Sequence, residues 1–168
     1  LCNFLNFLFQ LVMARMLNVV DYGILATLLA IIYILLIFTE SVQTIITKYS
    51  AQEKDKGKLK NLYMRSSKKA LKFSLLLYVF YLAVSIPLSF LLKIDYFLLS
   101  LNGLVIFLSF FIPISRGMMQ GKERFKALSI NMALESTGKI VFGIIFVMIG
   151  WKVFGALTGI LLGGVLSY

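Results

Sequence analysis

The sequence contains no histidine and one cysteine, Cys2. Without histidine it lacks the commonest general base, and zinc sites of the usual Cys/His type are excluded. A disulfide within the chain is excluded as well, because a bridge needs two cysteines. The sequence also has no Walker-type loop, no paired acidic motif and no nucleophile elbow. We therefore expect no enzymatic activity, no cofactor and no metal site in this chain.

Acidic residues are scarce too: the chain has 7 Asp and Glu against 17 Lys and Arg, a net charge of +10. Such an excess is also typical of nucleic-acid-binding proteins. Here, however, nine basic residues lie in the connector 48–72 and four in the connector 116–126. Clustering in alternate short loops is the pattern of the positive-inside rule. We therefore expect no nucleic acid as a partner, and we place these two connectors in the cytoplasm and the connectors 18–22, 93–95 and 151–152 outside.

Charge is nearly absent from four long stretches of the chain. Residues 23–47 contain only Glu40, residues 127–150 contain only Glu135 and Lys139, and residues 73–92 and 96–115 contain none. The chain is 60% hydrophobic with a mean hydropathy of +0.93. A membrane-spanning helix needs about 20 mostly apolar residues. The sequence therefore predicts an all-α, polytopic transmembrane helix bundle with the lipid bilayer as its surroundings.

We expect one transmembrane domain over residues 1–168, with six helices. The predicted helices cover residues 1–17, 23–47, 67–92, 96–115, 127–150 and 153–168. The first and last look like spans cut short, and the start does not resemble a signal peptide. Asp21 and Asp95 are expected to cap the helices that follow them. Residues 61–72 either lie along the membrane surface or extend the third helix into the cytoplasm.

Two features are expected to shape the spans. Pro87 and Pro113 lie inside predicted helices and should bend them, since each lacks a backbone N–H. Gly155, Gly159 and Gly163 recur every fourth residue in the last segment. Such a stripe lets another helix approach closely, so we interpret it as a packing surface rather than a ligand site.

The ionisable residues inside spans are the main candidates for function. At about 1.5 Å per residue, Glu40 and Glu135 lie roughly 12 Å and Lys139 roughly 18 Å from the cytoplasmic ends of their helices. Because a charge in lipid costs at least about 2.5 kcal/mol, these side chains should face protein or water. Our hypothesis is that they meet across one polar cavity, which Gln43 extends. The alternatives are a local pair between Glu135 and Lys139, spaced i, i+4, or a structural ion pair between helices. The sequence does not indicate in which direction the Asn102 side chain points.

Two motifs carry a family resemblance. The first reads ARML at residues 14–17 and DYG at residues 21–23; the second reads RGMMQGKERF at residues 116–125. Both resemble motifs of the polysaccharide-biosynthesis flippases, the Wzx-like branch of the multidrug/oligosaccharidyl-lipid/polysaccharide superfamily. In that family they follow the first helix and join the fourth to the fifth, and they occupy the matching connectors here.

The resemblance implies a MATE-like fold of about 12 to 14 helices in two lobes, of which this chain would be most of the N-terminal lobe. It implies transport of an isoprenoid-pyrophosphate-linked oligosaccharide across the cytoplasmic membrane, by alternating access, for polysaccharide export. Glycan-assembly proteins would be further partners. Cationic side chains suit the pyrophosphate, which makes Lys139 the main candidate and Arg15 and Arg116 secondary ones near the two mouths.

Three other functions remain open at this point. One is a cation-coupled exporter of drugs or small molecules from the same superfamily, in which Glu40 and Glu135 would bind the ion. Another is a membrane-embedded transferase acting on the same lipid carrier, which would need an acidic metal-binding motif in a loop. The third is a scaffold subunit without transport, for which charges inside the spans have no explanation.

Overall fold

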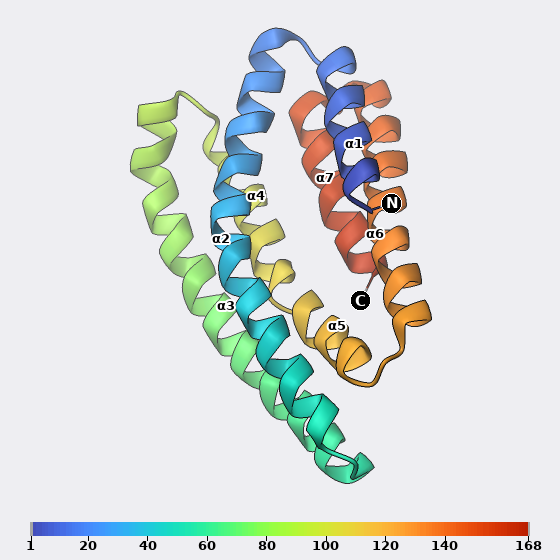
Figure 1. Ribbon diagram of the computed structural model, residues 1–168. Coiled ribbons are helices and arrows are strands. Elements are labelled where there is room, and N and C mark those ends of the chain that lie inside the picture. The colour runs from blue at the N-terminus through green and yellow to red at the C-terminus, as the bar shows by residue number, and fades with distance from the viewer. Residues whose placement is uncertain (1, 168) are drawn as a thin grey trace.

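The computed structural model describes residues 2–167, and its elements are all helices (Figure 1). In chain order they are α1 (Cys2–Met16), α2 (Val19–Gln52), α3 (Lys56–Leu92), α4 (Tyr96–Ser109), α5 (Ile112–Gly121), α6 (Phe125–Phe146), the π-helical turn η1 (Val147–Trp151) and α7 (Lys152–Leu166). The predicted all-α class is confirmed.

Four helical runs are long and apolar enough to span a membrane: Val19–Gln52, Lys56–Leu92, Tyr96–Gly121 and Phe125–Leu166. The last run contains a hairpin, because the chain reverses between α6 and α7 at Gly150, whose φ is 99°. The 34 residues of α2 extend roughly 51 Å, well beyond a hydrocarbon core of about 30 Å. This confirms a polytopic helical bundle, and α2 is longer than one crossing of the hydrocarbon core requires.

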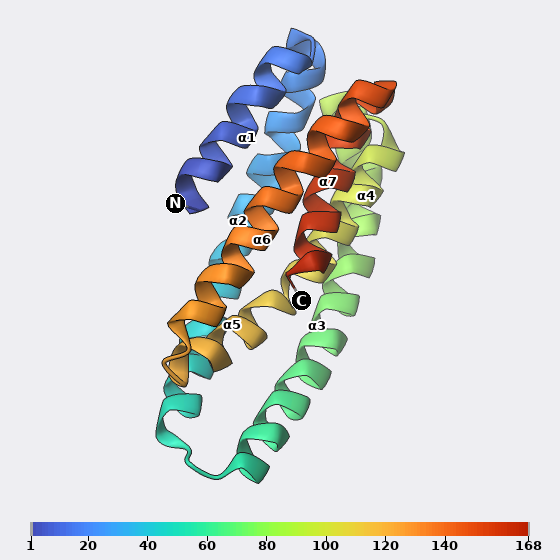
Figure 2. The ribbon, with the colours of Figure 1, turned by 90° about the vertical axis from the view of Figure 1, so that its right-hand side faces the viewer.

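Both lysine-rich turns lie at the same end of the bundle. Figure 1 shows the α2–α3 and α5–α6 turns at the lower end, and the α1–α2, α3–α4 and α6–α7 turns at the upper end. The positive-inside rule predicts this arrangement, because it expects lysine-rich loops on the same side of a membrane. Figure 2 shows α6 lying between α1 and α7.

One of the two predicted N-cap residues is found at the start of its helix. Asp95 caps α4 as predicted, since its carboxylate accepts a hydrogen bond of 3.2 Å from the backbone N–H of Phe97. The prediction for Asp21 is wrong. The second helix begins earlier, with Asn18 at its N-cap, and Asp21 lies in the first turn, 3.8 Å from the amine of Lys152.

Two further boundaries differ from the sequence-based expectation. Residues 61–72 continue α3 without a break, so the predicted extension of the third helix is confirmed and a separate surface-lying segment is not. Residues 96–115 do not form one helix: α4 ends at Ser109, and α5 starts at Ile112 with Pro113 in its first turn. Pro113 has no N–H for the carbonyl four residues earlier, which explains the break. Pro87, in contrast, lies inside α3.

The glycine stripe of α7 packs against α6. A Cβ added to Gly159 would lie 2.5 Å from the backbone nitrogen of Gly143, and one added to Gly163 would lie 2.7 Å from that of Lys139. These distances leave no room for any side chain, so α7 holds α6 at backbone contact. The stripe thereby fixes the position of the helix that carries Glu135 and Lys139.

Candidate functional site

A cavity of about 570 Å³ lies among α1, α2, α5 and α6, and its wall contains charged residues of both signs. We call it the polar pocket. Its polar and charged lining residues are Asn6, Tyr33, Thr39, Glu40, Gln43, Thr44, Thr47, Ser109, Arg116, Gln120, Glu135 and Lys139. Since α2 and α6 are membrane-spanning helices, these groups lie where lipid would otherwise surround them.

The glycines of the second motif dock α5 onto α2. A Cβ added to Gly117 would lie 2.8 Å from the carbonyl oxygen of Gln43, and one added to Gly121 would lie 2.5 Å from that of Thr47. The Ser50 hydroxyl also donates to the Gly117 carbonyl at 3.2 Å. The spacing of the two glycines therefore places α5 directly against α2, with Arg116 and Gln120 at the pocket.

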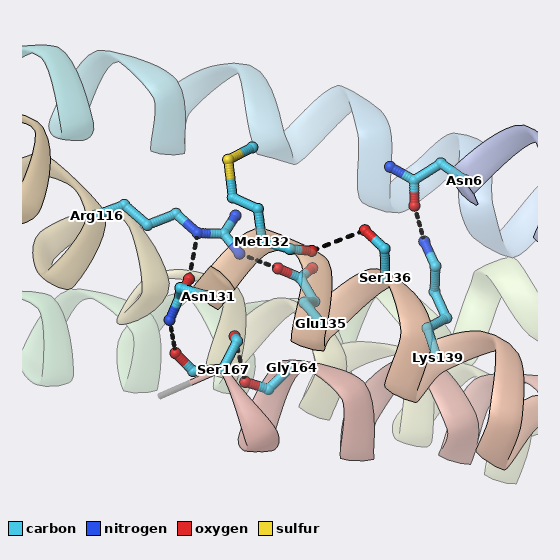
Figure 3. A network of polar contacts seen from close by, with 9 residues as sticks. All are labelled: Asn6, Arg116, Asn131, Met132, Glu135, Ser136, Lys139, Gly164 and Ser167. Carbon is cyan, nitrogen blue, oxygen red and sulfur yellow. Dashed lines mark hydrogen bonds and ion pairs between the residues drawn. The ribbon is translucent and has the colours of Figure 1, made fainter. Parts of the chain in front are cut away.

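Arg116 joins α5 to α6 through two side chains (Figure 3). Its guanidinium forms an ion pair with the carboxylate of Glu135, and its Nε donates to the amide oxygen of Asn131 at 2.9 Å. The Asn131 amide in turn donates to the backbone carbonyl of Ser167, just beyond α7. The Arg116 side chain is only 14% exposed. The network thus connects α5, α6 and the end of α7 at one side of the pocket.

Lys139 lies one helical turn beyond Glu135 but contacts a different helix. Its amine donates to the amide oxygen of Asn6 on α1 (Figure 3) and lies 5.1 Å from the centre of the Phe9 ring. Both partners are neutral. Among the ion pairs between described residues, none includes Lys139, so its positive charge is not neutralised by a direct carboxylate contact.

The α2 wall of the pocket contains Glu40 and Gln43. The Gln43 amide donates to the side-chain oxygen of Gln120 at 3.0 Å, and the Thr47 hydroxyl donates to the same atom at 3.4 Å. Glu40 is exposed, and no cation among residues 2–167 lies within ion-pairing distance of its carboxylate. It therefore presents a free carboxylate to the pocket.

The break between α4 and α5 also lines the pocket, through Ser109, Ile112 and Pro113. Irregular backbone at membrane depth is tolerated where it is buried in protein or lines a wet cavity. Interrupted helices are also how many transporters form their binding sites.

Within the described chain, no group of three or more Cys, Asp or Glu residues could hold a metal ion.

The structure brings five of the six predicted site residues together: Glu40, Gln43, Arg116, Glu135 and Lys139 all line the polar pocket. Arg15 does not join them, because it is exposed in the last turn of α1. A local ion pair between Glu135 and Lys139 is wrong, since each contacts a partner on another helix. The expectation that Arg116 lies in a loop is also wrong, since it lies in α5.

Asn102 lies elsewhere in the bundle. It is fully buried, and its amide donates to the Tyr81 hydroxyl at 3.2 Å and to the Leu28 carbonyl at 3.4 Å. It therefore connects α2, α3 and α4 rather than lining the pocket.

Sequence reasoning missed Asn6, Asn131 and Gln120, which are neutral polar residues in or next to apolar stretches. The signal that could have identified them is the free-energy cost of placing an amide side chain in lipid without a hydrogen-bond partner.

Comparison with known proteins adds one match. The model of a family described as polysaccharide biosynthesis protein matches residues 1–168. No curated protein and no solved structure matches the chain.

Proposed function

Since the chain belongs to the polysaccharide biosynthesis protein family, we propose that it is part of a transporter that flips an isoprenoid-pyrophosphate-linked oligosaccharide. The direction is from the cytoplasmic to the outer leaflet of the cytoplasmic membrane, for polysaccharide export. Family membership and the apolar helices support a role as a membrane transporter. The lipid-linked substrate, the choice of membrane and the mechanism are our proposals, as are glycan-assembly proteins as partners.

The observation that carries the proposal is the polar pocket among membrane-spanning helices, with Lys139 held inside it by neutral groups. A flippase must carry a charged, hydrated headgroup past about 30 Å of hydrocarbon while the lipid tail stays in the bilayer. A cavity lined by hydroxyl, amide and charged groups replaces the water that the sugar and phosphate lose. In a purely structural helix bundle, charged side chains at this depth cost free energy that apolar residues would avoid.

The two cations of the pocket differ in their availability to a pyrophosphate. Arg116 already contacts the carboxylate of Glu135, so an anionic ligand would compete with that ion pair. The Lys139 amine contacts the Asn6 amide oxygen and the Phe9 ring and forms no ion pair with a described residue, so a phosphate could replace a neutral partner. An ammonium–phosphate contact is a strong, charge-assisted hydrogen bond. We therefore assign phosphate binding to Lys139 first and to Arg116 second.

The mechanism that fits this placement is alternating access. The pocket would open to each side in turn as the lobe containing α1–α7 rocks against a second lobe of the full-length protein. Lys139 and Asn6 join α6 to α1, whereas Arg116 and Glu135 join α6 to α5. A bound headgroup that replaces one of these contacts would weaken the packing of α6 on α1 or on α5.

The test is transport of a lipid-linked oligosaccharide by the full-length protein in liposomes. We expect Lys139→Gln to lower the flipping rate at least about tenfold, Lys139→Arg to keep a measurable part of it, and Lys93→Gln to change it little. Lys93 is an exposed lysine at the C-cap of α3, away from the pocket. Wild-type transport by Lys139→Gln at wild-type abundance would refute the assignment.

One observation favours a second function. The unpaired carboxylate of Glu40 in the pocket is the kind of group that a cation-coupled exporter of drug-like molecules uses to bind its ion. Efflux of an organic cation that depends on a Na⁺ or proton gradient and is lost in Glu40→Gln would favour this exporter. Flipping of the lipid-linked sugar without any such efflux favours the flippase.

A further inference from the structure

A second cavity, of about 420 Å³, lies between α2 and α3 on the side of α2 opposite the polar pocket. Phe38, Val42 and Ile45 of α2 form one wall, and Ala70 and Phe73 of α3 form the other. We call it the α2–α3 groove. Phe38, Ile45 and Phe73 are each more than half exposed, so none of residues 2–167 covers the groove.

The groove exists because α2 and α3 pack on different partners. Helix α2 lies against Gly117 and Gly121 of α5. Helix α3 lies against Gly103 of α4, where an added Cβ would come within 2.7 Å of the Tyr81 ring. Although a short turn joins them, α2 and α3 therefore contact each other little. Phe73 closes the inner end of the gap by an edge-to-face contact with Phe110, with ring centres 5.5 Å apart.

The two ends of the groove differ in polarity. Lys69 and Ser66 line it, and Lys69 lies four residues before the uncharged stretch 73–92. Those 20 residues extend roughly 30 Å, the thickness of the hydrocarbon core, which places Lys69 at the level of the lipid headgroups. Phe38 and Phe110 line the opposite, apolar end. The groove therefore runs from the interface into the hydrocarbon.

The charge around its mouth is of one sign. Arg65 and Lys72 are four residues before and three after Lys69, so they are its neighbours on the surface of α3. The nearest carboxylates in the sequence, Glu53 and Asp55, are engaged at the α2–α3 turn: Asp55 caps α3, and Glu53 lies 3.9 Å from Lys58. The turn is about 14 residues, or roughly 21 Å of helix, from Lys69. The mouth is thus complementary to an anion.

We infer that the α2–α3 groove binds an anionic phospholipid of the cytoplasmic leaflet. One acyl chain lies between Phe38 and Phe73, and the phosphate contacts the Lys69 amine and the Ser66 hydroxyl. A phospholipid needs both features: apolar walls inside the bilayer for its acyl chain, and cations at headgroup depth for its phosphate. Because α2 separates the groove from the polar pocket, the lipid is bound in addition to a transported substrate and does not occupy the transport route.

The test measures lipid binding to the delipidated full-length protein by native mass spectrometry, with phosphatidylglycerol and phosphatidylcholine as probes. We expect Lys69→Gln to weaken phosphatidylglycerol binding about fivefold, as loss of one juxtamembrane charge implies, and to leave phosphatidylcholine unchanged. Lys60→Gln, at an exposed lysine of the same helix that lines no described cavity, should change neither. Ala70→Phe, which fills the groove, should weaken both lipids.

Three results would overturn the inference. Equal effects of Lys69→Gln and Lys60→Gln would mean that the basic surface attracts anionic lipid without a site. Unchanged binding of both lipids in a folded Ala70→Phe variant would mean that the groove is not occupied. Displacement of phosphatidylglycerol by an equimolar polyisoprenyl phosphate would assign the groove to the carrier lipid of the substrate instead.

Discussion

The guanidinium of Arg116 on α5 pairs with the carboxylate of Glu135 on α6, 19 residues further along the chain and at the edge of the polar pocket. Both side chains are largely withdrawn from solvent, 14% and 30% exposed. The pair explains why α5, a short helix inside the membrane region, carries an arginine in its second turn.

We expect this pair to stabilise the fold measurably. In a double-mutant cycle of Arg116→Gln and Glu135→Gln, the coupling free energy of unfolding should be about 1–3 kcal/mol, because partly buried charges in one network are screened little. The measurement is unfolding of the full-length protein in mixed micelles by a denaturing detergent. The exposed pair of Lys58 and Glu53, 3.9 Å apart, serves as the control, with an expected coupling below about 1 kcal/mol. Equal coupling in the two cycles would contradict the role of Arg116.

The glycine contact of α7 gives a prediction with a neighbouring control. Gly163→Ala should destabilise the protein by about 1–3 kcal/mol, since the new methyl group would lie 2.7 Å from the Lys139 nitrogen and 2.8 Å from the Glu135 oxygen of the rigid α6 backbone. Gly164→Ala should be tolerated, because its methyl group would meet only Ile112 at 3.6 Å. Thermal denaturation of the purified variants compares them directly. Similar melting temperatures for the two would show that α6 and α7 are not packed at backbone contact.

Glu40 is expected to affect transport and not stability. Its carboxylate has no cationic partner among the described residues, so Glu40→Gln should change the free energy of unfolding by less than about 0.5 kcal/mol. The charged oxygens accept stronger hydrogen bonds from sugar hydroxyls than an amide does. We therefore expect the flipping rate to fall about fivefold at normal abundance. Normal abundance together with normal transport would remove Glu40 from the proposed site.

Composition and charge pattern predict the class of this fold well. The uncharged stretches identify α2 and α3, because transfer free energies are summed along the chain, and the Lys/Arg bias of the short connectors places the two basic turns at one end. The depth of Glu40, Glu135 and Lys139 predicts that they face a common interior for the same reason. The structure places all three at one pocket.

The partners of those charges could not be predicted from spacing. Glu135 and Lys139 suit a local i, i+4 pair, yet each contacts a different helix because α6 is fixed between α1, α5 and α7. That position depends on backbone contacts at Gly159 and Gly163 and on the helix break before Pro113. Tertiary packing of this kind appears in the sequence only as glycine and proline spacing, which does not specify the partner.

One side of α2 lines the polar pocket, which we expect to be wet, and the opposite side lines the α2–α3 groove, which we expect to contact lipid. Thr44 lines the polar pocket and Ile45 lines the α2–α3 groove, and both side chains are exposed. The direct measurement introduces Thr44→Cys or Ile45→Cys into a Cys2→Ser background and follows reaction with a charged, membrane-impermeant maleimide in native membranes. We predict at least about tenfold faster labelling for Thr44→Cys, because thiolate and reagent both need water. Equal rates at the two positions would show that both sides of α2 border the same medium.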